Sequence, residues 1–173
     1  MDLILVDEND VPVGTMEKIE VHQKALLHRA FSIFIFNSKG DMLLHQRAMN
    51  KYHSGGLWTN ACCSHPGNGQ QTIDAAQKRL EEEMGFTVPL AKAFDFIYKA
   101  VLENGLTEYE YDHVFVGFYD GEINPDSKEV KDFCFASMQE IKNSFLSHPQ
   151  KYTEWFKIAF PRVEEYLATV PVN

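Results

Sequence analysis

The chain has 173 residues, three cysteines and a formal net charge of −9. This length predicts one domain over residues 1–173 with a substantial core, and the acidic balance argues against a nucleic-acid-binding or anionic-membrane-binding protein. No run of about 18 apolar residues is present, so no membrane span is expected. Residues 1–6 lack the basic segment and cleavage site of a signal peptide. Because three cysteines cannot all pair, we expect a reducing compartment, the cytoplasm.

The N-terminal part predicts short strands around one helix. Residues 3–7 read as a strand, residues 8–14 as a turn before a second short strand, and residues 17–23 as a short helix. The strongly apolar residues 28–36 predict a strand. The turn at residues 37–40 predicts that residues 42–46 pair back on that strand as a hairpin.

A long glycine-rich loop follows, at residues 50–69. It contains Gly55, Gly56, Pro66, Gly67 and Gly69, with Trp58, Cys62, Cys63 and His65 between them. A loop of this length inside a compact domain is more often functional than not. We therefore expect part of a site here.

Residues 72–84 give the clearest helix prediction. Thr72 is expected to cap it, and Gly85 is a natural C-terminal stop. One apolar stripe is expected from Ile73, Ala76, Leu80 and Met84. The acids at 81–83 oppose the helix dipole. An ordinary solvated face with an Arg79 ion pair would explain them, and so would a Mg²⁺ site.

The C-terminal half alternates strands and helices. Strands are predicted at residues 93–102, 108–119 and 133–136, with a turn at 103–105 between the first two. Residues 137–145 and 153–168 read as helices. Together with the N-terminal strands, this order predicts a mixed α/β fold.

Three imidazoles and two carboxylates are candidate metal ligands. They are His22, His28, His65, Glu108 and Glu110. The two glutamates lie two apart on a predicted strand, so both project from one face. This donor set suits Mn²⁺ or Zn²⁺, although most histidines bind no metal and strand glutamates usually face water. The other histidines, His45, His53, His113 and His148, are expected to be structural or exposed.

Two motifs resemble known families. Residues 79–85, Arg-Leu-Glu-Glu-Glu-Met-Gly, resemble a degenerate Nudix box. The upstream glycine, the upstream glutamate and the Arg-Glu pair of the full box are replaced by Ser64, Gln70 and Lys78-Arg79. Residues 58–66, Trp-Thr-Asn-Ala-Cys-Cys-Ser-His-Pro, closely resemble a segment of type I isopentenyl-diphosphate isomerases. Stretches at 27–32, 47–51, Tyr98 and 108–110 follow in that family's order. The several separated matches identify the chain as similar to this family.

The resemblance implies a Nudix-like α/β/α sandwich with a mixed sheet. It implies an isomerase of isoprenoid biosynthesis that interconverts isopentenyl and dimethylallyl diphosphate. Protonation and then deprotonation would pass through a tertiary carbocation. The expected partner is this small-molecule diphosphate alone, and the enzyme is expected to be a monomer or weak dimer.

The resemblance also implies roles for individual residues. Cys63 and Glu110 would be the catalytic acid and base, with Tyr98 hydrogen-bonded near Glu110. The five ligands named above would hold Mn²⁺ or Zn²⁺, and Glu83, together with the Cys63 carbonyl, would hold Mg²⁺. The diphosphate would be gripped by cations and the carbocation stabilised by an aromatic face, a substrate-binding set of Lys18, Arg47, Lys51, Arg79 and Trp155.

Simpler interpretations stay open for several of these residues. Cys62 and Cys134 are expected to be small buried hydrophobes, Trp155 is equally well a core residue, and Trp58 is expected to anchor the loop. Two other functions remain alternatives. One is a Nudix hydrolase, which Gln70 in place of the upstream glutamate disfavours. The other is a catalytically silent metal-binding module.

Overall fold

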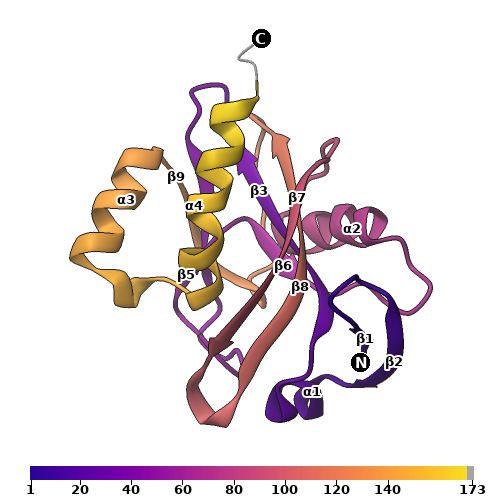
Figure 1. Ribbon diagram of the computed structural model, residues 1–173. Helices are drawn as coiled ribbons and strands as arrows, with labels where there is room; N and C mark the ends of the chain where they lie inside the picture. The colour runs from indigo at the N-terminus through magenta and orange to yellow at the C-terminus, as the bar shows by residue number, and fades with distance from the viewer. Residues whose placement is uncertain (171–173) are drawn as a thin grey trace.

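The computed structural model describes residues 1–170. It contains a nine-stranded mixed sheet with helices on both faces (Figure 1). The strands are β1 (Asp2–Val6), β2 (Pro12–Glu17), β3 (His28–Phe36), β4 (Met42–Arg47), β5 (Trp58–Thr59), β6 (Cys62–Ser64), β7 (Ala91–Val101), β8 (Thr107–Phe118) and β9 (Val130–Ala136). The helices are α1 (Lys18–Lys24), α2 (Thr72–Met84), α3 (Met138–Ser147) and α4 (Glu154–Thr169), with short 3₁₀ turns at Glu103–Gly105 and Pro149–Lys151. The expected mixed α/β/α arrangement is confirmed.

Strand β3 is the centre of the sheet. It runs parallel to β8 along its whole length and antiparallel to β1 and β6, while β7 and β8 form a long antiparallel pair. The expected hairpin between β3 and β4 is wrong beyond its turn, because only Phe36 and Met42 pair. Strand β4 pairs instead with β9 and β5. Apolar alternation predicts a strand but does not encode its partner.

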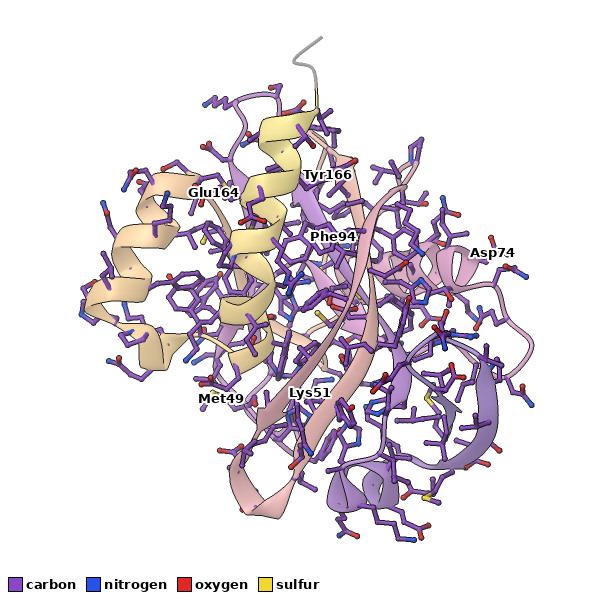
Figure 2. All side chains as sticks on the ribbon, viewed as in Figure 1. Met49, Lys51, Asp74, Phe94, Glu164 and Tyr166 are labelled. Carbon is purple, nitrogen blue, oxygen red and sulfur yellow. The ribbon has the colours of Figure 1, made fainter. Side chains whose placement is uncertain are left out.

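Alternating side chains of β3 fill two separate cores. Phe31, Ile33 and Ile35 pack under α2, whereas Phe34 and Phe36 pack under α4. Figure 1 shows α3 and α4 on one side of the sheet and α2 on the other. On the α4 side, Phe94 of β7 and Tyr166 of α4 lie together in Figure 2, with ring centroids 6.2 Å apart. None of the helices in residues 1–170 is long and apolar enough to cross a membrane.

Helix α2 has the expected bounds but not the expected details. Gln71, not Thr72, is its N-cap, and no side chain makes the capping hydrogen bond. Ile73 is 37 % exposed, so the buried face consists of Ala75, Ala76, Leu80, Glu83 and Met84. Gly85 ends the helix at φ 76°, as expected. The burial of Glu83 in this face turns one acid toward the interior of the protein.

One face of the sheet changes from apolar to polar along its strands. The residues of β3 and β8 that share the α4 face include the apolar Phe34, Phe36, Val114 and Val116 at one end. At the other end the same alternation brings His28, Ser32, Glu108, Glu110 and Asp112 to that face. Burying these polar groups requires hydrogen-bond partners or bound charges.

Candidate active site

The register of three strands builds a row of polar side chains. His28 of β3 pairs with Glu110 of β8, which pairs with Tyr98 of β7. Residues in register project from the same face, so the three side chains meet. The Tyr98 hydroxyl donates to Glu110 Oε2 over 2.6 Å, and His28 Nε2 lies 3.5 Å from Glu110 Oε1.

Five buried side chains converge around this row. Ligand atoms of His22, His28, His65, Glu108 and Glu110 all lie within 4.8 Å of one another. Helix α1 contributes His22, and the segment after β6 contributes His65, whose Nε2 is 3.0 Å from Glu110 Oε1. The structure therefore brings together the five candidate ligands from distant parts of the sequence.

The hydrogen bonds that His22 and His28 make through Nδ1 determine what their Nε2 atoms present to the centre of the five-residue group. His22 Nδ1 donates to the Lys18 carbonyl over 2.6 Å, and His28 Nδ1 donates to the Leu26 carbonyl over 2.9 Å. Carbonyls only accept, so in a neutral ring Nε2 presents a lone pair. Yet His22 Nε2 lies 3.0 Å from a carboxylate oxygen of Glu108. Within residues 1–170, His28 Nε2 has no hydrogen-bond partner. A divalent cation between these lone pairs resolves both, so the residues fit a metal ion.

The pKa shifts of His65 and Glu110 also favour a metal ion in this group. Burial, followed by the charge of Lys18, lowers the pKa of His65 well below its usual value, which leaves the neutral imidazole that binds metals. Burial raises the pKa of Glu110, but the nearby His28 outweighs this, and the pKa is lowered. His65 therefore offers a neutral imidazole to a metal ion, and Glu110 offers a carboxylate.

A cavity of about 420 Å³ lies next to this five-residue group. His65, Glu108 and Glu110 line it, whereas His22 and His28 do not. The other predicted site residues all contribute to its wall, namely Lys18, Arg47, Lys51, Cys63, Arg79, Glu83, Tyr98 and Trp155. One cavity is thus lined by most of the residues that the sequence predicted for the site.

The two adjacent cysteines face opposite sides of strand β6. Cys62 is fully buried in the core under α2, whereas Cys63 lines the cavity. The Cys63 thiol donates to Asn60 Oδ1 over 3.1 Å, and its sulfur lies 3.4 Å from Ser32 Oγ. Burial raises the pKa of the Cys63 thiol, so the protonated form dominates at neutral pH. The third cysteine, Cys134, is expected to be buried, and this expectation is wrong, because Cys134 is exposed.

The four cations of the cavity differ in their partners. Lys51 is paired with Glu129, and Arg79 is paired with Glu83. Lys18 and Arg47 have no carboxylate partner within 4.0 Å in residues 1–170. They lie instead over aromatic rings, Lys18 Nζ 5.1 Å from the Tyr52 centroid and the Arg47 guanidinium 5.2 Å from that of Trp155.

Glu83 lies apart from the five-residue group. It lines the cavity from the C-terminal end of α2, and burial raises its pKa. Nearby, Gln70 Oε1 accepts a hydrogen bond from the Gly67 amide over 3.1 Å, which stabilises the loop. The position that holds glutamate in the full Nudix box is thus occupied here by a neutral loop-bracing side chain.

Sequence reasoning missed His53, which it left as structural or exposed. His53 lines the cavity, its Nε2 lies 3.4 Å from Glu108 Oε1, and its ring meets Trp155 edge-on at 5.7 Å. His45 also lines the cavity, but it is fully buried and its Nδ1 donates to the Ala61 carbonyl. His53 lies close to the motif at 47–51, but no periodic pattern in residues 50–57 indicates which way its side chain points.

The remaining histidines match the structural expectation. His113 Nε2 lies 3.0 Å from Asp10 Oδ2, and His113 Nδ1 lies 3.1 Å from Asp95 Oδ1, away from the cavity. His148 caps α3 at an exposed position, next to Ser147. Trp58 packs against the core on the α4 side, as a loop anchor should.

Comparisons with known proteins show what this chain is similar to. The family model for the NUDIX domain matches residues 26–156. The protein named Isopentenyl-diphosphate Delta-isomerase 2 from Photorhabdus laumondii subsp. laumondii is 48 % identical over 169 residues, which cover 95 % of this chain and 96 % of that protein. The Isopentenyl-diphosphate Delta-isomerase from Pectobacterium atrosepticum is 48 % identical over 167 residues, covering 95 % and 92 %.

Solved structures support the fold. The MutT protein from Methanosarcina mazei Go1 has a TM-score of 0.66 at 17 % identity, covering 80 % of this chain and 94 % of that chain. RenU, a Nudix hydrolase from M. smegmatis, has a TM-score of 0.62 at 15 % identity, covering 98 % and 97 %. At these identities the likeness extends to the fold alone.

Proposed function

The chain belongs to the Nudix family and, within it, to the isopentenyl-diphosphate Delta-isomerases, and we propose that the cavity above is where it interconverts isopentenyl and dimethylallyl diphosphate. One observation carries this assignment. A protonated thiol, Cys63, and a carboxylate, Glu110, line the same cavity. Moving an unactivated double bond needs a proton donor and a proton acceptor around one short hydrocarbon chain.

The reaction balances with these two groups. One of them gives a proton to the terminal methylene carbon of the double bond, which leaves a tertiary carbocation. The other takes a proton from the carbon beside the diphosphate-bearing carbon, and the electron pair of that C–H bond forms the new double bond. Tyr98 holds Glu110 through its hydroxyl and keeps the carboxyl turned toward the reacting chain.

Trp155 supports the carbocation from the cavity wall. Its indole face attracts positive charge but is a poor nucleophile, so it stabilises the cation without trapping it. The Arg47 guanidinium lies 5.2 Å from the centroid of this ring, which supports a role of the ring face in binding a cation. The side chain of Trp155 is 5 % exposed, and this burial helps to exclude water that would capture the carbocation.

Local positive charge from cationic side chains and metal ions allows a protein of net charge −9 to bind an anionic diphosphate. Lys18 and Arg47 offer charges without a carboxylate partner to the diphosphate, and Lys51 and Arg79 offer further ones after exchange with their glutamates. When bound, Mn²⁺ or Zn²⁺ in the histidine–glutamate group supplies charge that fixes the Glu110 carboxyl, and Mg²⁺ at Glu83 supplies charge that neutralises phosphate oxygens. The chain's own cations then orient the substrate with its hydrocarbon end toward Cys63.

The lack of a disulfide supports the expected compartment. Cys62, Cys63 and Cys134 are all free thiols in the described part of the chain. Cys62 and Cys63 face opposite sides of β6 and do not pair with each other, and free thiols such as these persist in a reducing environment. We therefore propose that the enzyme acts in the cytoplasm, on a small diphosphate substrate.

Proton NMR tests the proposed function. Isopentenyl diphosphate is incubated with the protein and Mg²⁺ in deuterium oxide, and the methyl signals of dimethylallyl diphosphate should appear, with deuterium at the exchanging carbons. A panel of nucleoside diphosphate derivatives is tested in parallel for phosphate release. Release at about 1 s⁻¹ or faster, without any isomerisation, would assign the chain as a hydrolase instead.

A further inference from the structure

A buried polar pair lies behind Cys63 and has no role in the proton transfers described above. Ser32 of β3 is directly opposite Cys63 of β6 in the sheet register. Its hydroxyl donates to Asp112 Oδ2 over 2.8 Å. Ser32 is 3 % exposed and Asp112 is 1 % exposed, and Asp112 Oδ1 has no partner in the described residues. A buried carboxyl group with an unpaired oxygen costs stability, so a structural role alone explains it poorly.

The directions of the hydrogen bonds around the sulfur follow from the available protons. Ser32 has one hydroxyl proton, which it donates to Asp112, so its oxygen faces Cys63 as an acceptor. The amide nitrogen of Asn60 donates to the Ile33 and Cys62 carbonyls, 2.9 Å and 3.1 Å away. This fixes the Asn60 amide so that its oxygen faces the sulfur.

The Cys63 thiol therefore lies between two acceptor oxygens, and each oxygen is fixed by the hydrogen bonds that its own residue donates. The sulfur is 3.1 Å from Asn60 Oδ1 and 3.4 Å from Ser32 Oγ. A single S–H proton shared between two fixed oxygens restricts the rotation of the side chain. The sulfur stays at the cavity wall instead of turning back into the sheet.

We propose that Ser32, held in place by Asp112, is a positioning residue that fixes the Cys63 thiol for proton transfer. The proposal rests on the proposed function, because it assumes that Cys63 exchanges a proton with the substrate. Neither Ser32 nor Asp112 lines the cavity, so neither touches the substrate. Their effect reaches the reaction through the orientation of the thiol.

Steady-state kinetics of four variants tests the proposal. Ser32→Ala and Asp112→Ala should each lower kcat by about tenfold, the loss expected when one hydrogen bond no longer orients a reacting group. KM should stay within about a factor of two, since substrate binding is not affected. Asp112→Asn should recover most of the loss, because its amide oxygen still accepts the Ser32 proton. Cys62→Ala, on the same strand but the opposite face, is the matched control and should keep its kcat.

Thiol alkylation gives a readout that does not depend on isomerase activity. Iodoacetamide labelling of Cys63, followed by peptide mass spectrometry, is compared with labelling of the exposed Cys134 in the same sample. Ser32→Ala and Asp112→Ala should label Cys63 several-fold faster than the wild type, because the freed thiol samples more orientations. A chain that fails to isomerise but shows this change refutes the proposed function and not the positioning.

Three results would overturn the inference. The first is an unchanged kcat and an unchanged Cys63 labelling rate in both alanine variants. The second is a loss in Asp112→Asn as large as that in Asp112→Ala, because the acceptor would then not matter. The third is an equal loss of kcat in Cys62→Ala, which would mean that strand β6 tolerates no change. If Ser32→Ala does not fold, the Asp112 pair decides between the same outcomes.

Discussion

At the scale of single residues, the four cationic side chains that line the cavity differ in whether a carboxylate already pairs with them. Lys51 and Arg79 have glutamate partners, so a diphosphate must compete for them. Arg47 has none within 4.0 Å in residues 1–170, and its buried Nε, like that of Arg79, has no hydrogen-bond partner there. A buried guanidinium donor without an acceptor is poised for an anion. Arg47 should therefore contribute more to substrate binding than Arg79.

Replacing Arg47 tests this difference. Arg47→Met keeps an unbranched side chain and removes the charge, and it should raise KM for isopentenyl diphosphate by about tenfold or more, as expected for a lost charge-assisted hydrogen bond. Arg162→Met is the matched control, because the Arg162 guanidinium also lies over an aromatic ring, 4.9 Å from the Phe96 centroid, but outside the cavity. A KM that stays unchanged in Arg47→Met would remove Arg47 from the diphosphate site. Steady-state kinetics measures both variants.

The sequence motifs predicted most of the site residues, but they did not predict His53. Most of the predicted ligands and cations lie in segments that resemble the family, and the structure brings them to one cavity or directly beside it. His53 lies in an irregular loop with no periodic pattern, so nothing local to it indicated that it faces Glu108. Neighbours across a fold depend on tertiary packing, which spacing along the chain does not encode.

At the scale of elements, the end of α2 depends on one backbone conformation. Gly85 has φ 76°, and a Cβ atom built there would lie 2.2 Å from the Asn124 carbonyl oxygen. The segment between β8 and β9, which contains Asn124, thus passes too close to Gly85 to admit a side chain there. This contact fixes the end of the helix that presents Glu83 to the cavity.

Gly85→Ala should therefore destabilise the protein. Strain in the left-handed region costs roughly 1–2 kcal/mol, and the clash with Asn124 adds to it. Gly40→Ala is the matched control, because Gly40 has φ 80° but no atom within 4 Å of its added Cβ. Urea unfolding should show a clearly larger loss of free energy for Gly85→Ala than for Gly40→Ala. Equal losses would mean that the Asn124 contact relaxes without cost.

The sequence predicted the elements better than their partners. The bounds of β3 and α2 were predicted to the residue, because apolar periodicity and Gly85 define them. The pairing of β4 was wrong, since alternation does not choose between β3 and β9. The short strands β5 and β6 were read as loop, because two or three residues are too few to show a period.

At the scale of the whole molecule, buried ionisable side chains from distant segments meet in the group of five candidate ligands. The five ligands join α1, β3, the segment after β6, and β8. A cation at their centre would cross-link the N-terminal elements to the middle of the sheet. Such an ion stabilises the folded state, because the unfolded chain offers no assembled site.

Metal removal should lower the melting temperature. At a metal concentration about 100 times the Kd, binding contributes about 2.7 kcal/mol, and for a chain of this size each kcal/mol corresponds to roughly 2–4 °C. Calorimetry before and after chelation should thus show a loss of about 5–10 °C that Mn²⁺ or Zn²⁺ restores. His28→Ala should contain less metal and respond less to chelation, whereas His148→Ala should behave as the wild type. An unchanged melting temperature would contradict the cross-link.

The most direct test of the account compares isomerisation rates of three variants by proton NMR. The claim is that the Cys63 thiol and the Glu110 carboxyl act on one substrate from the walls of one cavity. Cys63→Ala and Glu110→Gln should each lose about a hundredfold or more of the wild-type rate, the range of general acid–base catalysis, while Cys62→Ala stays close to the wild type. A Cys63→Ala protein that isomerises as fast as the wild type, or a Cys62→Ala protein that loses as much as Cys63→Ala, would contradict it.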